Sequence, residues 1–399
     1  MNLASILDLN RLAQQEGALH REKRGLYGTI RSESGRHFVG IIGPRGAGKT
    51  ILLRQLASES AESCYVSLDT LPSETDLFEL VRELSERYHF RKFFLDEVHY
   101  ADDSLGAMKK IYDFLNVHIV FTSSVALRIR ESVHDLARRV RLHTLDYFSF
   151  REYLQLKDGL RLTRLTIDHL LNGEIASSYI QVEDRFQAYL SGGLMPYSLE
   201  EPEPMPLLES TIETIINRDI PSLLRLHIDE LDKLSKMLVF VGRSGIDGIN
   251  YTSLSDNLGI TKYKAEQYVE LFEKAFLMQR LWPSGTNVLK EPKVLLMPPV
   301  RLLYRPLKDA WGGLREDFVA LAMRQAQLSL HYLKGTRGQK TPDFHLHYKG
   351  ENIVFEVGGK GKGREQFKGI HCDRKMILAE NGSPWTPQRM PLHLLGFLA

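Results

Sequence analysis

The sequence predicts an α/β protein with a doubly wound parallel β-sheet, because five short β-rich apolar segments alternate with helical segments in its N-terminal part. This alternation needs crossover connections, which make the strands parallel and cover both faces of the sheet. The segments expected to form strands are 37–42, 64–68, 91–100, 116–124 and 140–145. The sheet is therefore expected to occupy the first third of the chain.

Length and composition limit the classes of protein that fit. The chain has 399 residues, which is room for two or three domains at about 150 residues each. Its first residues lack a basic leader region, and no apolar run reaches the roughly 18 residues of a membrane span, so a cytoplasmic protein without a membrane partner is expected. Two cysteines, Cys64 and Cys372, are too few for a disulfide framework and lack zinc-ligand spacing.

Charge is unevenly distributed along the chain. Residues 291–399 contain 17 Lys and Arg against 10 Asp and Glu, a net charge of +7, and the chain as a whole carries +2, which leaves −5 for residues 1–290. A basic C-terminal region is where a polyanion such as DNA would bind, although a surplus of this size also serves solubility.

A glycine-rich motif follows the first predicted strand. Residues 43–50 read GPRGAGKT and lead into a helical pattern at 50–56, the context of a Walker A phosphate-binding loop. Gly43, Gly46 and Gly48 permit the tight path that turns successive amide groups toward phosphates at a helix N-terminus. A glycine-rich turn without a ligand is the alternative.

The motif assigns a role to each polar group in this loop. The Lys49 ammonium is expected to reach the β and γ phosphates of ATP, and the Thr50 hydroxyl to bind Mg²⁺. The residues expected to contact the nucleotide are Gly43, Pro44, Arg45, Gly46, Ala47, Gly48, Lys49, Thr50 and Ile51.

Two carboxylates end the third predicted strand, in RKFFLDEVHY at 91–100. They fall where a parallel strand meets the ligand crevice, which is typical of a Walker B segment. Asp96 is expected to hold Mg²⁺, and Glu97 to orient and polarise the attacking water. An acidic helix cap after a strand is the alternative.

Hydroxyls end the fourth predicted strand, and arginines precede the fifth. We take Ser123 as the candidate sensor of the γ phosphate, although strand capping explains the same residue type. Arg138 and Arg139 are candidates for an arginine that neutralises the transferring phosphoryl group from a neighbouring subunit. An arginine paired with a local acid is the alternative.

These motifs in this order resemble predicted AAA+ ATPases of bacteria and archaea that carry a winged helix and a C-terminal restriction-endonuclease-like (PD-(D/E)xK) domain. The resemblance rests on GPRGAGKT at 43–50, FLDEVH at 94–99, FTSS at 121–124, LARRV at 136–140, FSFREYL at 148–154, SGGLMPY at 191–197 and NRDI at 217–220. It implies an ATPase core over 1–155, a helical lid over 156–228, a winged helix over 229–290 and a nuclease-like domain over 291–399. It favours Arg139 as the finger, but the choice between Arg138 and Arg139 stays open.

The region 231–281 has helix-turn-helix spacing, with a turn at Gly259. Its second helix is expected at 261–272 and carries Lys262, Lys264, Gln267 and Glu270 on its polar side. This mixed set is compatible with a DNA-reading helix and with a packing module.

The last domain resembles the PD-(D/E)xK nucleases through LREDFVALAMR at 314–324, TPDFHLHY at 341–348 and IVFEVGGKGKG at 353–363. The resemblance implies that Asp343 and Glu356 hold Mg²⁺, helped by Glu316, while Lys360 steadies the nucleophile. The usual lysine position is Gly358 here, with Lys360 two residues later, so a docking domain derived from a nuclease is favoured over an active one.

Three functional hypotheses follow. The preferred one is an oligomeric, ring-forming AAA+ motor that uses ATP and Mg²⁺ to remodel or move along DNA, including branched DNA. The second is a nucleotide-gated switch for a protein partner, and the third is an ATP-controlled, Mg²⁺-dependent nuclease. DNA structure, subunit number and pathway are not specified by the residues.

Overall fold

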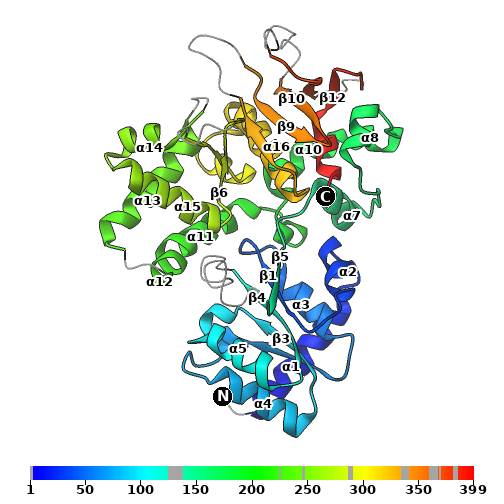
Figure 1. Ribbon diagram of the computed structural model, residues 1–399, viewed down its shortest axis with the longest axis vertical. Coiled ribbons are helices and arrows are strands. Elements are labelled where there is room, and N and C mark those ends of the chain that lie inside the picture. Colours follow the sequence, from blue (N-terminus) through cyan, green and yellow to red (C-terminus); the bar gives the residue numbers. More distant parts are fainter. Residues whose placement is uncertain are drawn as a thin grey trace. The chain divides into compact units, whose positions relative to one another are not determined.

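The computed structural model of the protein describes residues 3–124, 138–223, 226–244, 248–285, 291–333, 341–358, 367, 370–380 and 385–399. The chain divides into two compact units, Met1–Tyr147 and Phe148–Ala399 (Figure 1). The finer division into four domains, with boundaries at 155, 228 and 290, remains a prediction. Among the described residues, no helix has the length and hydrophobicity that crossing a bilayer requires.

The first unit consists of alternating helices and parallel strands. In chain order, its elements are α1 (Leu3–Leu19), α2 (Gly25–Arg31), β1 (Phe38–Ile42), α3 (Lys49–Ala57), β2 (Ser63–Ser67), η1 (Leu68–Thr70), α4 (Leu77–Tyr88), β3 (Lys92–Asp96), η2 (Val98–Tyr100), α5 (Ser104–Phe114), β4 (His118–Ser123) and β5 (Val140–Thr144). All five predicted strands are present.

The sheet of the first unit has the order β2-β3-β4-β1-β5, and every neighbouring pair is parallel. This confirms the predicted parallel α/β architecture. Because β4 lies between β1 and β3, the residues that end β4 stand between the loop after β1 and the carboxylates that end β3.

Both faces of this sheet are covered by helices. One face carries Val39, Tyr65 and Phe94, which pack in a single hydrophobic cluster with residues of α1, α2 and α3. Successive side chains of a strand point to opposite faces. Phe38 therefore faces the other side, where its ring meets Tyr112 of α5 edge-on, with centroids 5.3 Å apart.

The second unit has a helical part followed by two small sheets. Its helices and strands are α7 (Phe150–Asp158), α8 (Ile167–Asn172), α9 (Ser177–Ile180), α10 (Phe186–Ala188), α11 (Pro204–Thr214), α12 (Ile220–Leu223), α13 (Ile228–Arg243), α14 (Tyr251–Leu258), α15 (Lys262–Lys274), β6 (Met278–Leu281), β7 (Lys293–Leu296), α16 (Leu307–Gln325), β8 (Leu330–Tyr332), β9 (Phe344–Tyr348), β10 (Glu351–Val357), β11 (Arg374–Ala379) and β12 (Arg389–Pro391). Short 3₁₀ or π turns are η3 (Glu183–Arg185), η4 (Tyr189–Gly193), η5 (Pro196–Leu199), η6 (Ile215–Asp219), η7 (Pro298–Leu303) and η9 (Leu392–Phe397).

Helices α13, α14 and α15 are followed directly by β6 and β7, which form an antiparallel two-stranded ribbon. Local chemistry fixes the turn between α14 and α15. Gly259 ends α14 in the left-handed region at φ 61°, and the Thr261 hydroxyl accepts a hydrogen bond from the Lys264 amide at the start of α15. The helices and turn expected over 231–281 are thus present.

The C-terminal sheet has the order β12-β11-β10-β9-β8. Strands β8, β9 and β10 pair antiparallel, whereas β10, β11 and β12 pair parallel. This mixed sheet and α16 form an additional α/β part of the chain after residue 291, whereas the nuclease-like domain implied there by the resemblance remains a prediction.

A buried ion pair joins four elements of the second unit. The Arg301 guanidinium of η7 donates to both carboxylate oxygens of Asp317 in α16, at 2.7 and 3.1 Å, and to the Val241 carbonyl oxygen of α13 at 3.3 Å. The Leu296 amide at the end of β7 donates to the same carboxylate at 3.1 Å. Burial raises the pKa of Asp317, and the charge and hydrogen bonds of Arg301 oppose that shift.

We expect Asp317→Ala to destabilise the second unit by about 3–5 kcal/mol, because it leaves the Arg301 charge buried without its partner. Urea denaturation followed by tryptophan fluorescence measures this, since Trp282, Trp311 and Trp385 all lie in the second unit.

The matched control is Asp232→Ala. Its partner Lys236 lies on an exposed face, with side chains 60% and 65% accessible, so a change below about 1 kcal/mol is expected. Equal losses in the two variants would show that the buried pair does not hold these elements together.

Candidate nucleotide site

The loop between β1 and α3 has the backbone that a phosphate cradle needs. Gly46 and Gly48 have φ of 75° and 87°, in the left-handed region that favours glycine. A Cβ on Gly43 would lie 2.0 Å from the Leu145 carbonyl oxygen, so a side chain there would displace the backbone that follows β5. The loop is therefore shaped by its glycines and by the chain that passes beside it.

Lys49 opens α3 and is only 4% exposed. Its ammonium donates to the carbonyl oxygens of Gly43 and Pro44, both at 2.9 Å. A buried cation beside the amides of a helix N-terminus is a donor set that fits a polyphosphate. Thr50 and Ile51 follow in the first turn of the same helix, so the predicted nucleotide contacts form one continuous segment.

Arg24 and Tyr147 contact this loop from outside it, and neither residue belongs to a motif identified in the sequence. The Arg24 guanidinium donates to the Ala47 carbonyl oxygen at 2.8 Å and to the carbonyl oxygens of Asp146 and Tyr147 at 3.0 and 3.3 Å. The Tyr147 hydroxyl donates to the Arg45 carbonyl oxygen at 3.2 Å. The loop backbone is thereby connected to the last residues of the first unit.

Asp96 lies at the end of β3 and is 2% exposed. One carboxylate oxygen accepts a hydrogen bond from the Tyr65 hydroxyl of β2 at 2.8 Å, and the other accepts one from the Thr122 hydroxyl of β4. These two strands flank β3, so the carboxylate is held from both sides at the edge of the sheet.

Glu97 has φ 53° and ψ 53°, a left-handed conformation that is uncommon for a residue with a side chain. Its carboxylate accepts hydrogen bonds from the Ser124 amide, at 2.9 Å, and from the Ser124 hydroxyl, and it lies 3.2 Å from Nδ1 of His99. Burial would raise the pKa of Glu97, but hydrogen bonding by His99 and Ser124 and the charge of Lys49 lower it to about 2. The group is therefore an ionised carboxylate at neutral pH.

Two hydroxyls at the end of β4 contact the carboxylates that end β3. Thr122 bonds to Asp96, and Ser124 bonds to Glu97. Ser123 is fully buried, and its hydroxyl lies 3.2 Å from Nδ1 of His99. The sensor role of Ser123 remains a prediction.

Comparison with known proteins agrees with this geometry. Residues 35–154 match the family model described as an AAA domain. The uncharacterized protein MJ1637 of Methanocaldococcus jannaschii is 30% identical over 374 residues, which cover 83% of this chain and 77% of that protein. The chain contains a P-loop AAA-type ATPase domain and belongs to the same family as this archaeal protein.

Two further matches are a family model for the second unit and a solved structure with low sequence identity. Residues 183–297 of the ATPase match a family model described as a domain of unknown function. A chain of the S. cerevisiae Hsp104-ADP complex is 16% identical, with a TM-score of 0.30, over 79% of this chain and 46% of that chain. This chain thus spans less than half of that structure, at a score too low to define a common fold.

The candidate finger residues of the ATPase lie at the opposite end of the sheet from its own phosphate loop. Phe38, which begins β1, donates its amide to the Arg139 carbonyl oxygen at 2.7 Å, whereas the loop follows the other end of β1. The Arg139 guanidinium donates to both oxygens of Asp113 at 3.1 Å and lies over the Tyr112 ring. Arg138 is exposed. The local pairing that the sequence left as an alternative is therefore present.

The carboxylates of the proposed nuclease-like site are partly brought together. Strands β9 and β10 pair antiparallel with Phe344 opposite Phe355, so the next position along this register places Asp343 opposite Glu356. The Asp343 carboxylate also accepts a hydrogen bond from the Val357 amide at 2.7 Å. Glu316 instead pairs with Lys293 at 2.7 Å. Lys360 lies outside the described residues, and among the residues that are described no group of three or more His, Cys, Asp or Glu side chains is arranged to hold a metal ion.

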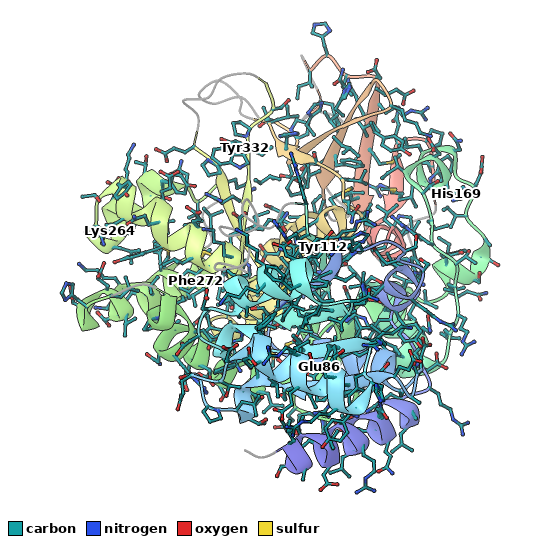
Figure 2. All side chains as sticks on the ribbon, turned by 60° about the horizontal axis from the view of Figure 1, so that its bottom comes forward. Glu86, Tyr112, His169, Lys264, Phe272 and Tyr332 are labelled. Atoms are coloured by element: carbon teal, nitrogen blue, oxygen red, sulfur yellow. The ribbon has the colours of Figure 1, made fainter. Side chains whose placement is uncertain are left out.

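The three lysines of helix α15 are all paired with acidic side chains. Lys262 pairs with Glu291 at 2.9 Å, and Lys264 pairs with Glu230, which lowers the pKa of that glutamate to about 2. Figure 2 labels Lys264 on the outer part of α15 and Phe272, which is buried, farther along the helix. The polar side of this helix is thus largely engaged within its own unit.

We expect Glu97→Gln to lower the rate of ATP hydrolysis about 100-fold or more while nucleotide affinity stays within a few-fold, because the substitution removes the charge that polarises water but keeps the size of the side chain. Steady-state phosphate release and fluorescent-nucleotide binding measure the two quantities.

Lys49→Ala is the contrasting variant, in which binding itself should fail because the charge clamp on the phosphates is lost. Hydrolysis by Glu97→Gln at the parent rate would show that another group positions the water.

Proposed function

We propose that this ATPase is an oligomeric AAA+ motor that acts on DNA, by remodelling, branch migration or translocation. The observation that carries the hydrolytic part is the meeting of Lys49, Asp96 and Glu97 at one edge of the sheet, with Thr122 and Ser124 between them. ATP is the proposed substrate and Mg²⁺ the proposed metal.

The residues of the site fit these two groups. Residues 43–51 would bind the nucleotide, with Lys49 at the β and γ phosphates, and Thr50 and Asp96 would hold the metal. Mg²⁺ bound there would neutralise phosphate charge. Glu97 would orient the attacking water, and its low pKa keeps it ionised for that task.

Self-association is supported by the position of Arg139. Arg139 precedes β5 and therefore lies at the amino end of the parallel strands, whereas the phosphate loop of the same chain lies at their carboxyl end. It could therefore act on phosphate only in a neighbouring copy, as arginines supplied in trans do. In that case its pair with Asp113 must open when the copies assemble.

We expect Arg139→Ala to lower ATP turnover at least about tenfold without weakening nucleotide binding, since a finger acts in the transition state. Mixing tests the trans geometry. Arg139→Ala and Glu97→Gln subunits each lack a different half of a shared site, so a mixture should regain activity that neither variant has alone.

Two controls accompany that experiment. Asp113→Ala releases Arg139 from its local pair and should not lower turnover, whereas Arg138→Ala identifies which arginine acts. If the mixture stays inactive and Arg139→Ala alone turns over like the parent, neither trans action nor the finger role of Arg139 stands.

DNA as the substrate is supported by the +7 charge of residues 291–399 and by the three-helix and ribbon arrangement of α13–α15 with β6 and β7, the order of elements in a winged helix. The engaged lysines of α15 argue that the C-terminal part, rather than this helix, makes most of the phosphate contacts.

The same engagement favours the second candidate function, a nucleotide-gated switch that binds a protein partner. A helix whose cations are paired internally is suited to packing against protein. A motor and a switch differ in how their turnover responds to DNA.

For a motor, we expect double-stranded, single-stranded or branched DNA to raise ATP turnover several-fold at low salt, with the effect fading as salt rises because phosphate contacts release counterions. Turnover is measured with each DNA on protein whose oligomeric mass has been determined. The response should disappear in Lys49→Ala.

Other outcomes of the experiment assign other functions. Slow turnover that no DNA changes would contradict the motor and favour the switch. Plasmid cutting in Mg²⁺ that is lost in Asp343→Ala would support an ATP-controlled nuclease built on Asp343 and Glu356.

A further inference from the structure

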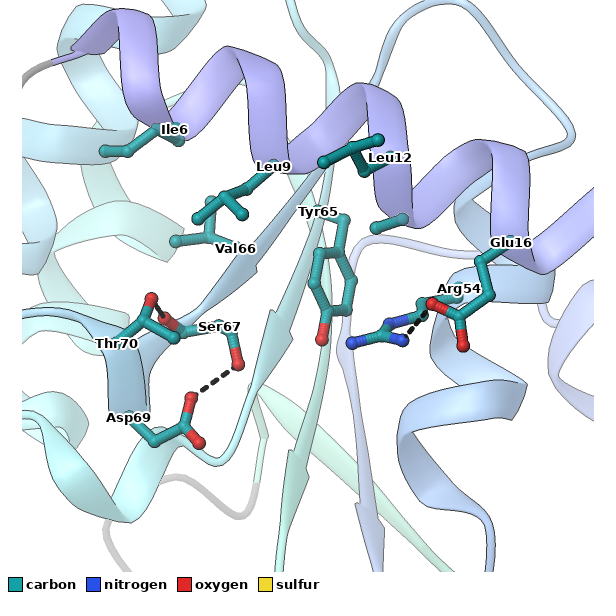
Figure 3. Close-up of a pocket in the computed structure, with 11 residues that line it drawn as sticks. Ile6, Leu9, Leu12, Glu16, Arg54, Tyr65, Val66, Ser67, Asp69 and Thr70 are labelled. Carbon is teal, nitrogen blue, oxygen red and sulfur yellow. Dashed lines mark hydrogen bonds and ion pairs between the residues drawn. The ribbon is translucent and has the colours of Figure 1, made fainter.

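A cavity of about 260 Å³ lies in the first unit between α1 and β2, and none of residues 43–51 lines it (Figure 3). Strand β2 is an edge strand of the sheet, and α1 covers it. The Asn10 side chain accepts a hydrogen bond from the Tyr65 amide at 2.8 Å, and the Gln14 side chain donates to the Ser63 carbonyl oxygen at 3.0 Å. The cavity therefore has a defined floor and a helix as its wall.

The lining combines an apolar wall with one uncompensated charge. Leu9 and Leu12 of α1 line it although 41% and 52% of their surface is exposed. At one end Glu16 and Arg54 form an ion pair and neutralise each other. At the other end Asp69 is exposed, and it accepts a hydrogen bond from the Ser67 hydroxyl at 2.6 Å (Figure 3). The net charge of the lining is thus that of Asp69.

We propose that this cavity binds an aliphatic ammonium, with its carbon chain against Leu9 and Leu12 and its cation at Asp69. Apolar side chains beside a carboxylate suit a group with an apolar stem and a charged head. At roughly 30 Å³ per water molecule, the cavity holds the volume of several waters, enough for a five-carbon chain. A lysine side chain of a partner protein and a free polyamine share this chemistry.

Tyr65 connects this cavity to the candidate metal carboxylate. Its ring forms part of the lining and carries the Arg54 guanidinium at 5.3 Å, while its hydroxyl donates to Asp96 at 2.8 Å. A ligand that shifts the ring also shifts a donor to Asp96, so occupancy of the cavity and of the nucleotide site are coupled. This second step rests on the proposed nucleotide binding, whereas the ammonium site does not.

The first experiment measures binding of n-pentylamine, pentan-1-ol and pentanoate to the full chain by NMR titration. The amine should bind at least about threefold more tightly than the alcohol, and Asp69→Asn should remove this preference, as expected for one solvent-exposed charge pair. Asp8→Asn, on the exposed side of α1, is the matched control and should keep the preference. Equal affinities for the three probes, or an unchanged preference in Asp69→Asn, would overturn the proposal.

The source of the ammonium is distinguished by comparing spermidine with the capped tripeptide Leu-Lys-Leu. Tighter binding of the tripeptide indicates a protein side chain, and tighter binding of spermidine indicates a free polyamine. Binding of neither probe overturns the assignment of the ammonium to these two sources, whereas the site itself is decided by the n-pentylamine preference and its loss in Asp69→Asn.

The second experiment compares amine affinity with and without Mg²⁺ and ADP. Coupling requires a reciprocal change, here expected to be about fivefold in the parent and absent in Tyr65→Phe. No change in the parent overturns the coupling. If the protein binds no nucleotide at all, the proposed function fails, yet the amine preference and its loss in Asp69→Asn still decide the ammonium site.

Discussion

The site depends on the burial of the Asp96 carboxylate at the edge of a parallel sheet. A charge that is 2% exposed is costly unless it is hydrogen-bonded. Its two partners, Tyr65 and Thr122, come from the strands on either side of β3, so the carboxylate is stable only if β2, β3 and β4 lie next to one another. The hydrogen bonds that stabilise the Asp96 carboxylate therefore depend on the order of the strands in the sheet.

The same strand order places β4 between the phosphate loop after β1 and the carboxylates of Asp96 and Glu97 after β3. Because β4 pairs with both β1 and β3, its last residues lie between the ends of these two strands. The Glu97 amide donates to the Thr122 hydroxyl at 2.9 Å, and Ser124 donates to the Glu97 carboxylate through its amide and its hydroxyl, so Glu97 is held at both its backbone and its side chain in a left-handed conformation. A strained residue persists where its surroundings fix it, as is common at functional sites.

Local motifs predicted the fold of the first unit and the positions of the groups proposed for the site. The strands of the first unit, the loop with Lys49 and the positions of Asp96 and Glu97 follow from short patterns whose meaning is set within a few residues. The hydroxyl partners could not be chosen in this way. Thr122, Ser123 and Ser124 are adjacent, and only the strand register decides which of them faces an acid.

Residues that act from a distance carried no signal in the sequence. Arg24 reaches the loop from the segment before α2, and Tyr65 reaches Asp96 from another strand. In the second unit, the sequence drew attention to Glu316, whereas its neighbour Asp317 holds four elements together through Arg301. One position along a helix turns a side chain by about 100°, which a single sequence resolves poorly when both residues are acidic.

The hydrogen bond from Tyr147 to the backbone of Arg45 has a mechanical consequence. Tyr147 is the last residue of the first unit, so the residue at which the chain leaves this unit is hydrogen-bonded to a carbonyl group of the phosphate loop. A loop that tightens around a bound anion must draw this residue with it or break the bond. The path of the loop backbone and the direction in which the chain leaves the first unit are therefore mechanically linked by a single side chain.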